Sequence, residues 1–224
     1  MQQGPAMFSD IMCGSDRSYP LAAPPPAMHL PMKFCAYCGA RLERRTPPGD
    51  QRMRDVCTAC HTVHYQNPKV VAGCVPEWDG RILLCRRAIE PRRGFWTLPA
   101  GFMENDETMA EAAVRETLEE ASAGIEIDAL YALFNLPHIN QVYVMFRGRL
   151  RQASFGPGDE SLEVALFEEP EIPWGDLAFP VVRETLRLYF ADRMRGTFGM
   201  YTGDLVRDSD AAGGFRTLLL NAGA

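Results

Sequence analysis

Three glutamates occupy a single turn of a predicted helix. Glu116, Glu119 and Glu120 are spaced at i, i+3 and i+4, so their carboxylates share one helix face. Like charges crowded in this way repel by about 4 kcal/mol per pair at about 4 Å and an effective dielectric near 20. Hard oxygen ligands of this kind select Mg²⁺ or Mn²⁺, which hold phosphates while retaining waters. The alternative is a plain acidic surface with splayed side chains, and composition alone leaves both interpretations open.

The helix that must carry these carboxylates has a clear start. Thr108 followed by Glu111 is typical of a capping box, and the helix is expected to run to about Ala121 or Ala123. We expect a set of small and apolar residues on the opposite side to be buried. These residues are Ala110, Ala113, Val114, Leu118 and Ala121.

The order of residues around this helix favours the metal site over the acidic surface. Gly101 is followed after five residues by Glu107 and after seven more by the run 115–120, Arg-Glu-Thr-Leu-Glu-Glu. The run 96–100, Trp-Thr-Leu-Pro-Ala, precedes them. This arrangement resembles the signature loop and helix of the Nudix hydrolases, which fixes many positions across more than 20 residues. A chance match over that length is improbable.

Two residues depart from the family pattern. Thr117 stands where an aliphatic residue is usual, and Ser122 stands where a glycine is usual. Thr117 can still bury its methyl group. Gly124 is expected to supply the left-handed cap, which would extend the helix slightly. Neither departure removes a carboxylate.

The resemblance implies a Mg²⁺-dependent (or Mn²⁺-dependent) pyrophosphatase. Such an enzyme hydrolyses a nucleoside diphosphate linked to another moiety, giving a nucleoside monophosphate and a second phosphate. The metal ligands it implies are the Gly101 carbonyl, Glu116, Glu119 and Glu120. The catalytic residues it implies are Glu116, Glu120, Arg115, Glu107 and Glu163. Arg115 is expected to orient neighbouring glutamates through a bidentate pair. The general base stays open between Glu116, Glu160 and Glu163.

Substrate contacts are expected from both arginines and aromatic residues. The expected substrate-binding residues are Arg86, Arg87, Phe102 and His138, and Arg92 and Arg93 also flank the approach. Tyr131, Phe134, His138 and Tyr143 are candidates to stack on adenine or flavin. Aromatic residues on strands are more often core residues, and this alternative stays open.

Four of the seven cysteines form two pairs that predict a structural zinc site. Cys35-x2-Cys38 and Cys57-x2-Cys60 are separated by 18 residues, the spacing of a four-cysteine zinc ribbon. The alternatives are four buried thiols or two disulfides. His61 and His64 could replace a ligand, but four cysteines already complete a closed site. Such a site has no open position for chemistry.

Zinc ribbons precede Nudix domains in two groups, the NADH pyrophosphatases and a group similar to FAD or ADP-ribose pyrophosphatases. The segments 35–39, 64–69 and 135–138 resemble the second group. The Ser-Gln-Pro-Trp-Pro-Phe-Pro type of motif of the first group is absent. The resemblance therefore implies FAD or ADP-ribose as substrate, with NADH as a further candidate.

Hydrophobic patterns predict the elements around the site. Strands are expected at 70–75, 81–85, 95–99, 125–136, 141–150 and 164–167, the last being the final strand. Asp79-Gly80 predicts a hairpin between the first two, and Pro180 opens a helix that ends before Gly196. In that helix the apolar residues Val182, Leu186, Tyr189 and Phe190 repeat at helical spacing.

The family resemblance and the chain's patterning together define its organisation. The implied fold is α/β (α+β), a Nudix α/β/α sandwich with a mixed sheet, preceded by a small zinc ribbon. We expect a disordered, proline-rich extension at 1–31, the ribbon at 32–66, the Nudix domain at 67–196 and a C-terminal tail at 197–224.

The chain-wide charge and hydropathy restrict the partners. A formal net charge of −6 over 224 residues disfavours binding along a nucleic acid, and no apolar run is long enough to span a membrane. We expect a cytoplasmic protein with a small nucleotide as substrate. The family resemblance implies a homodimer.

Two other functions remain open at this stage. The first is a ligand sensor or RNA-binding protein that uses the ribbon as a contact module, and the second is hydrolysis of a non-nucleotide diphosphate.

Overall fold

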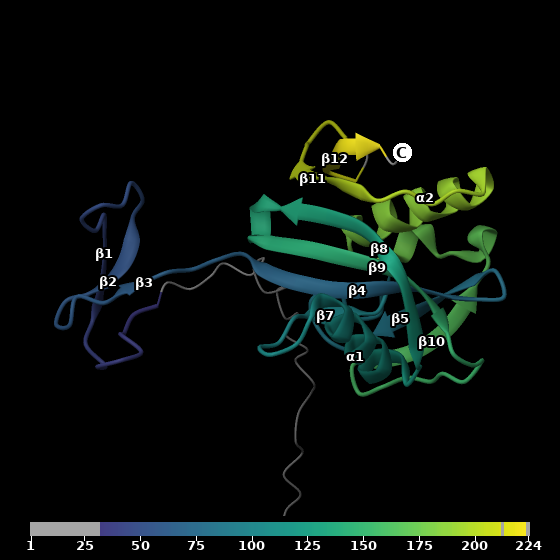
Figure 1. The fold of residues 1–224 in the computed structure, drawn as a ribbon, viewed down its shortest axis with the longest axis horizontal. Coiled ribbons are helices and arrows are strands. Elements are labelled where there is room, and N and C mark those ends of the chain that lie inside the picture. The colour runs from purple at the N-terminus through teal and green to yellow at the C-terminus, as the bar shows by residue number, and fades with distance from the viewer. Residues whose placement is uncertain (1–31, 212, 223–224) are drawn as a thin grey trace, which may run out of the picture. The chain divides into compact units, whose positions relative to one another are not determined.

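The computed structural model describes residues 32–211 and 213–222. The extension expected to be disordered at 1–31 lies outside the described residues. Residues 33–66 contain a three-stranded antiparallel sheet in the order β1-β2-β3 (Figure 1). Its strands are β1 (Leu42–Arg45), β2 (Arg54–Cys57) and β3 (Val63–His64).

A second, larger sheet has nine strands and is mixed, as the sequence predicted. The strand order is β10-β5-β4-β9-β8-β11-β12, with β6 paired to β5 and β7 paired to β4. β4 pairs in parallel with β9, and β8 with β11, while the other pairs are antiparallel. The strands are β4 (Lys69–Trp78), β5 (Arg81–Arg87), β6 (Trp96–Thr97), β7 (Ala100–Phe102), β8 (Ile125–Leu136), β9 (Gln141–Leu150), β10 (Ser161–Phe167), β11 (Tyr201–Arg207) and β12 (Phe215–Ala222).

Helices α1 (Met109–Ala121) and α2 (Pro180–Arg195) contribute to two separate hydrophobic cores on the large sheet. Tyr143 and Met145 of β9 belong to the core that contains α2, and Val144 and Phe146 belong to the core that contains α1. Because adjacent residues of β9 point to opposite faces, this strand is buried on both sides. The expected α/β/α sandwich is confirmed. Three short 3₁₀ helices complete the elements of the described residues: η1 (Pro137–Ile139), η2 (Glu169–Glu171) and η3 (Trp174–Asp176).

The hairpin predicted at Asp79-Gly80 is present. Both residues have positive φ, 48° and 74°, and Trp78 pairs with Arg81 across the turn. A two-residue turn with both φ values positive matches the twist of the flanking strands. The predicted bounds of β8 and β9 are also confirmed.

Helix α2 begins at Pro180 and ends at Arg195, just before Gly196, as predicted. Gly196 adopts a left-handed conformation with φ of 71° and caps the helix. The four apolar residues that gave the helical pattern are all buried: Val182, Leu186, Tyr189 and Phe190.

The segment after residue 196 was expected as a C-terminal tail, and no element was predicted in it. It forms β11 and β12, which extend the sheet next to β8. The inward positions of β11 are Tyr201, Gly203 and Leu205. A glycine in the middle of this row removes one apolar side chain, and so it hides the period-two pattern. The strand at 164–167 is therefore not the last one.

Candidate active site

The helix that carries the glutamates is held by the predicted capping box. The Thr108 side chain accepts a hydrogen bond from the Glu111 N–H, and the Glu111 carboxylate accepts one from the Thr108 N–H. Ser122 ends the helix with φ of 48°, and its N–H donates to the Leu118 carbonyl. The expectation that Gly124 supplies the left-handed cap was therefore wrong, because Ser122 itself takes that conformation.

The buried face of α1 differs by one position from the predicted face. Thr117 is fully buried and its hydroxyl donates to the Ala113 carbonyl at 2.8 Å, whereas Leu118 is 57% exposed. Residues 113, 117, 120 and 121 form the inward stripe at helical spacing. Glu120 consequently points inward and is only 5% exposed. The carboxylate face and the buried face overlap, which the sequence analysis did not anticipate.

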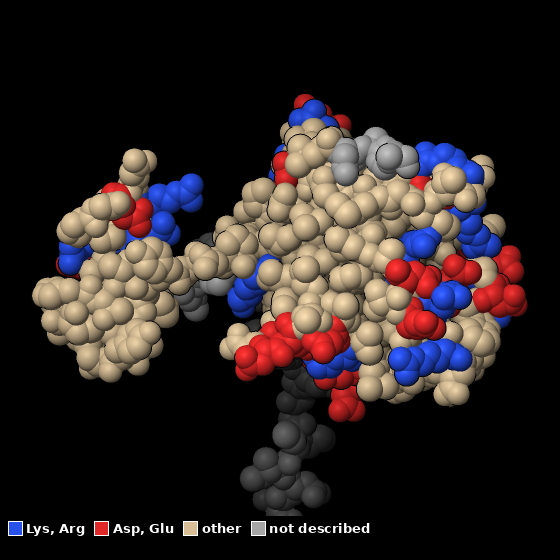
Figure 2. All heavy atoms as spheres, viewed as in Figure 1, with Lys and Arg blue, Asp and Glu red and all other residues tan. Residues whose placement is uncertain are grey.

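Gly101 of β7 lies directly against the helix. A Cβ atom added at Gly101 would come within 2.3 Å of the Glu116 carboxyl atoms, so only glycine fits here without displacing that side chain. β7 is fixed in turn by pairing with β4, where Ala72 lies opposite Gly101. Acidic side chains gather on the surface over β7 and α1 in the view of Figure 2.

Arg115 connects the acidic side chains. Its guanidinium binds both carboxylate oxygens of Glu107, at 3.0 and 2.7 Å, as the predicted bidentate pair. It also donates to Glu116 at 2.7 Å, to Glu119 at 3.0 Å and to the Phe102 carbonyl at 3.1 Å. The hydrogen bonds from Arg115 lower the pKa of Glu107 to about 2. Those with Glu107 raise the pKa of Arg115 itself.

Glu116 and Glu120 are the unusual carboxyls of the site. The pKa of Glu120 is raised to about 8, first by burial and then by the nearby charge of Glu116, against a weak hydrogen bond from the Ala100 N–H at 3.3 Å. Burial also raises the pKa of Glu116. A carboxyl that resists ionisation in this way ionises readily when a cation binds beside it.

The donor set fits a hard divalent cation. Glu116, Glu119, Glu120 and the Gly101 carbonyl offer only oxygen atoms, which suit Mg²⁺ or Mn²⁺. Among the described residues, only the cysteine group has all its ligand atoms within 4.8 Å of one another, so the three carboxylates are more widely spread. Arg115 accounts for the spread, because it holds Glu116 and Glu119 while Glu120 turns toward Ala100.

The two candidate glutamates from the later loop differ in their surroundings. Glu160, whose carbonyl accepts a hydrogen bond from the Ala88 N–H, raises the pKa of both Glu116 and Glu120 through its charge. Glu163 instead forms an exposed ion pair with Arg86 at 3.4 Å. The charge of Glu160 therefore acts on the carboxylate cluster, whereas Glu163 pairs with Arg86.

Arg86 and Arg87 also differ in their surroundings. Arg87 lies 5.2 Å over the ring of Phe179 and donates to the Pro91 carbonyl, and its charge lowers the pKa of Glu120. Arg86 faces Glu163 and the Gly94 carbonyl. Of the two arginines, Arg87 is the one whose charge acts on Glu120.

Most of the aromatic candidates lie in the core. Tyr131, Phe134 and Tyr143 are 1%, 0% and 9% exposed, so the alternative that these rings serve as core residues is confirmed. His138 packs against Phe215 of β12 with ring centroids 5.1 Å apart, and it is not brought to the glutamates by any described contact. Phe102 is 46% exposed beside Gly101.

The four predicted zinc ligands converge. Sγ–Sγ distances are 3.7 Å for Cys35–Cys60, 3.4 Å for Cys38–Cys57 and 3.5 Å for Cys38–Cys60. These values are near the separation of about 3.8 Å expected for sulfurs that surround one tetrahedral zinc ion at about 2.3 Å. A disulfide would need about 2.05 Å, so the disulfide alternative does not hold.

The sequence profile of the NUDIX domain matches residues 67–184, more than half of the chain. The chain belongs to the Nudix hydrolase family. A second profile, described as Nudix N-terminal and named for a zinc ribbon, matches residues 33–66.

Individual relatives agree with the family. A crystal structure of a NUDIX hydrolase from Nitrosomonas europaea has 55% sequence identity and a TM-score of 0.76, and the match covers 77% of this chain and 98% of that one. An ADP-ribose pyrophosphatase of Methanocaldococcus jannaschii is 30% identical over 115 residues, which cover 49% of this chain and 67% of that protein. A NAD-capped RNA hydrolase of Edwardsiella ictaluri is 35% identical over 92 residues, 40% of this chain and 33% of that protein. The matches thus span about a third to two thirds of these curated relatives.

The Nudix structure also holds contacts that the sequence analysis missed. The Ala100 N–H binds Glu120, and the Lys69 ammonium lies 4.7 Å from the centroid of the Phe102 ring. Residue spacing gave no signal for either. Ala100 meets Glu120 where β7 packs against α1, and Phe102 meets Lys69 where β7 pairs with β4.

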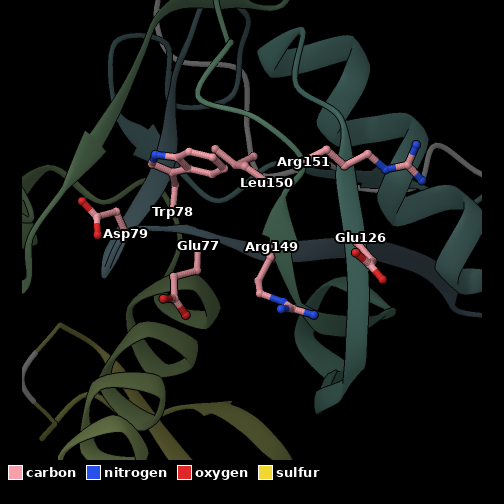
Figure 3. A pocket seen from close by; sticks show the side chains of 7 residues that line it. All are labelled: Glu77, Trp78, Asp79, Glu126, Arg149, Leu150 and Arg151. Carbon is pink, nitrogen blue, oxygen red and sulfur yellow. The ribbon is translucent and has the colours of Figure 1, made fainter.

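A separate hollow of about 640 Å³ lies at the hairpin end of β4, away from the residues that pair with β7 (Figure 3). It contains none of the predicted site residues, and it lies outside the active site. Its lining residues are Glu77, Trp78, Asp79, Glu126, Arg149, Leu150 and Arg151.

No described helix is long and apolar enough to cross a membrane.

Proposed function

We propose that the chain is a Mg²⁺- or Mn²⁺-dependent pyrophosphatase that hydrolyses a nucleoside diphosphate linked to another moiety. The products are a nucleoside monophosphate and a second phosphate. The observation that carries the proposal is the inward Glu120 beside Glu116, at a pKa raised to about 8 by burial and by that neighbour. Such a costly arrangement of carboxyls in a fold of this family supports cation binding.

Glu116, Glu119, Glu120 and the Gly101 carbonyl would hold the cation. When bound there, Mg²⁺ offsets the charge of the diphosphate and lowers the pKa of a coordinated water. Arg115 keeps Glu116 and Glu119 in place and is fixed itself by the bidentate contact with Glu107. Arg87 contacts a phosphate oxygen of the substrate, held for that task by Phe179 and the Pro91 carbonyl.

A side chain must accept the proton of the attacking water. Glu160 is the stronger candidate, because its charge reaches both metal-binding glutamates while Arg86 occupies Glu163. Glu116 is restrained by Arg115, which competes for its oxygen atoms.

ADP-ribose and FAD are the first substrates to test. The relative named as an ADP-ribose pyrophosphatase and the ribbon motifs at 35–39, 64–69 and 135–138 favour an adenosine diphosphate with a variable second half. NAD, free or linked to RNA, is the second candidate, since several relatives are named NAD-capped RNA hydrolases.

The test is a substrate panel with and without Mg²⁺ or Mn²⁺, comparing wild type with Glu120→Gln. The panel contains ADP-ribose, FAD, NADH, NAD, NAD-capped RNA and diadenosine polyphosphates. The proposal predicts cation-dependent release of a nucleoside monophosphate that Glu120→Gln largely abolishes, with the zinc content unchanged. Tight binding of a nucleotide without product would indicate a ligand sensor and would overturn the proposal.

A further inference from the structure

The zinc ribbon exposes three large aromatic rings. Phe34, Tyr37 and Tyr65 are 57%, 80% and 63% exposed, whereas the interior of this small unit consists of the cysteine site and residues such as Val56. Single exposed apolar residues are ordinary on a protein surface. Three large exposed rings within residues 33–66 offer surfaces on which flat apolar groups of a partner can stack.

Positive charge is concentrated in the same unit. Residues 33–66 contain six Lys and Arg but only three Asp and Glu, although the whole chain has 23 and 29. The three acids are already engaged or buried: Glu43 pairs with Arg45, Asp50 pairs with Arg54, and Asp55 is 8% exposed. Four cations consequently have no ion pair among the described residues. They are Lys33, Arg41, Arg44 and Arg52.

Rings and cations lie next to each other. Phe34 pairs with Arg41 in an antiparallel bridge, so the two residues are cross-strand neighbours. The Arg54 guanidinium lies 5.1 Å from the centroid of the Tyr65 ring. The Tyr37 ring lies 5.9 Å from the ring of His64. A ligand that alternates anionic groups with stackable planes would satisfy both kinds of contact.

We propose that the zinc ribbon, residues 33–66, binds a single-stranded polynucleotide. Bases stack on Phe34, Tyr37 and Tyr65, and phosphates pair with Arg41, Arg44 and Arg52. The net charge of the whole chain predicts no such partner, but the positive charge is confined to the ribbon. This inference goes beyond the proposed hydrolysis and does not depend on it.

The experiment uses the full zinc-loaded chain and fluorescein-labelled oligonucleotides of about 12 nucleotides, oligo-U and oligo-dT, within the usual site size. Fluorescence anisotropy is followed between roughly 50 and 200 mM salt. With three phosphate contacts on a single strand, log K should fall with log salt with a slope of about −2. Comparison of oligo-U with oligo-dT shows whether RNA or DNA is preferred, and binding of either supports the proposal.

Matched variants separate stacking from charge. The double variant Tyr37→Ala, Tyr65→Ala should weaken binding by about tenfold or more. Arg44→Glu with Arg52→Glu should weaken binding and bring the salt slope toward zero. The controls are Met194→Ala, at a site 83% exposed on α2, and Arg151→Glu with Arg187→Glu, which changes the charge equally elsewhere. Zinc content verifies that the ribbon of each variant is folded, and the hydrolysis assay verifies the Nudix domain.

Oligonucleotide binding that is absent, or that is equal in the tyrosine variant and the controls, would overturn the proposal. Displacement of the probe by polyglutamate as efficiently as by unlabelled oligonucleotide would also overturn it, because it would indicate an acidic protein as the partner. Cation-dependent nucleotide hydrolysis is measured in parallel on the same variants and should not change. Failure of the ribbon proposal is therefore distinguishable from failure of the proposed activity.

Discussion

Glu120 is both an unfavourably buried carboxyl and a proposed ligand of the catalytic cation. Its carboxyl keeps a proton up to about pH 8 in the folded protein, while in the unfolded chain it ionises near its ordinary pKa of 4.5. The stabilisation from the folded, protonated carboxyl is thus fully present below about pH 4.5 and is lost as the pH rises through about 8. At roughly 1.4 kcal/mol per pKa unit, the loss is at most a few kcal/mol.

Glu120→Gln should remove this pH dependence, because the amide does not ionise. Without added magnesium or manganese, the free energy of unfolding of wild type should fall from about pH 5 to about pH 9 by more than that of the variant. Urea unfolding at both pH values measures the difference between the two proteins. Equal changes in wild type and variant would show that Glu120 is not held in a raised-pKa state.

The two later glutamates give a second prediction for single residues. Glu160→Gln should lower kcat by about 10²-fold or more, the usual contribution of a general base, whereas Glu163→Gln should change it by much less. The reason is that the charge of Glu160 acts on Glu116 and Glu120, whereas Glu163 forms an ion pair with Arg86 on the surface. A steady-state comparison at saturating substrate decides between them, and a larger effect of Glu163→Gln would reverse the assignment.

At the scale of elements, local sequence signals predicted α1 well at its start and less well along its length. The capping box of Thr108 and Glu111 is a contact between residues three apart, so the sequence contains all of it. Burial of Thr117 in place of Leu118 depends on how the helix rolls against β4 and β7, which is a tertiary property. The same rotation of α1 about its axis turns Glu120 inward.

The missed C-terminal strands are anchored by contacts between distant residues. Asp192 of α2 is fully buried and accepts hydrogen bonds from the hydroxyls of Tyr131 and Tyr201 and from the Gly199 N–H. Arg195 adds an ion pair to Asp192. No periodicity reveals such a cluster, since its members come from β8, α2 and β11.

Tyr201→Phe tests this anchor. Because it leaves a buried carboxylate with one donor fewer, it should lower the free energy of unfolding by about 1–3 kcal/mol. Tyr65→Phe, at a site 63% exposed, is the matched control and should change stability very little. Denaturant unfolding of both variants provides the comparison, and equal stabilities would contradict the role of Asp192 as an anchor.

At the scale of the whole molecule, the ribbon and the Nudix domain offer two different kinds of metal site. Four cysteine sulfurs converge as in a closed zinc site. The oxygen ligands proposed beside Gly101 would leave coordination positions for water and substrate. Short-range patterns in the sequence predicted both sites. These patterns are the two C-x-x-C pairs and the run from Arg115 to Glu120. The roles proposed for Arg87 and Glu160 were harder to assign from the sequence, because Arg86 and Glu163 lie nearby in the chain as equivalent candidates.

Removal of zinc should unfold the ribbon alone. The folding energy of a small four-cysteine unit comes mainly from the metal, whereas the Nudix domain has its own two cores. A Cys57→Ser variant should therefore lose zinc and the protection of residues 33–66 against proteolysis, while residues 67–222 stay protected. Cleavage throughout the chain at the same rate would contradict this independence.

The most direct test of the central claim is a calorimetric titration of Mn²⁺ into wild type, Glu120→Gln and the control Glu126→Gln, all with zinc bound. The account predicts that wild type and Glu126→Gln bind Mn²⁺ equally. Glu120→Gln should bind it at least about tenfold more weakly, since even groups that only support metal ligands contribute about 10- to 100-fold. Equal affinity of Glu120→Gln and wild type would contradict the assignment of the inward glutamate as a ligand of the catalytic cation.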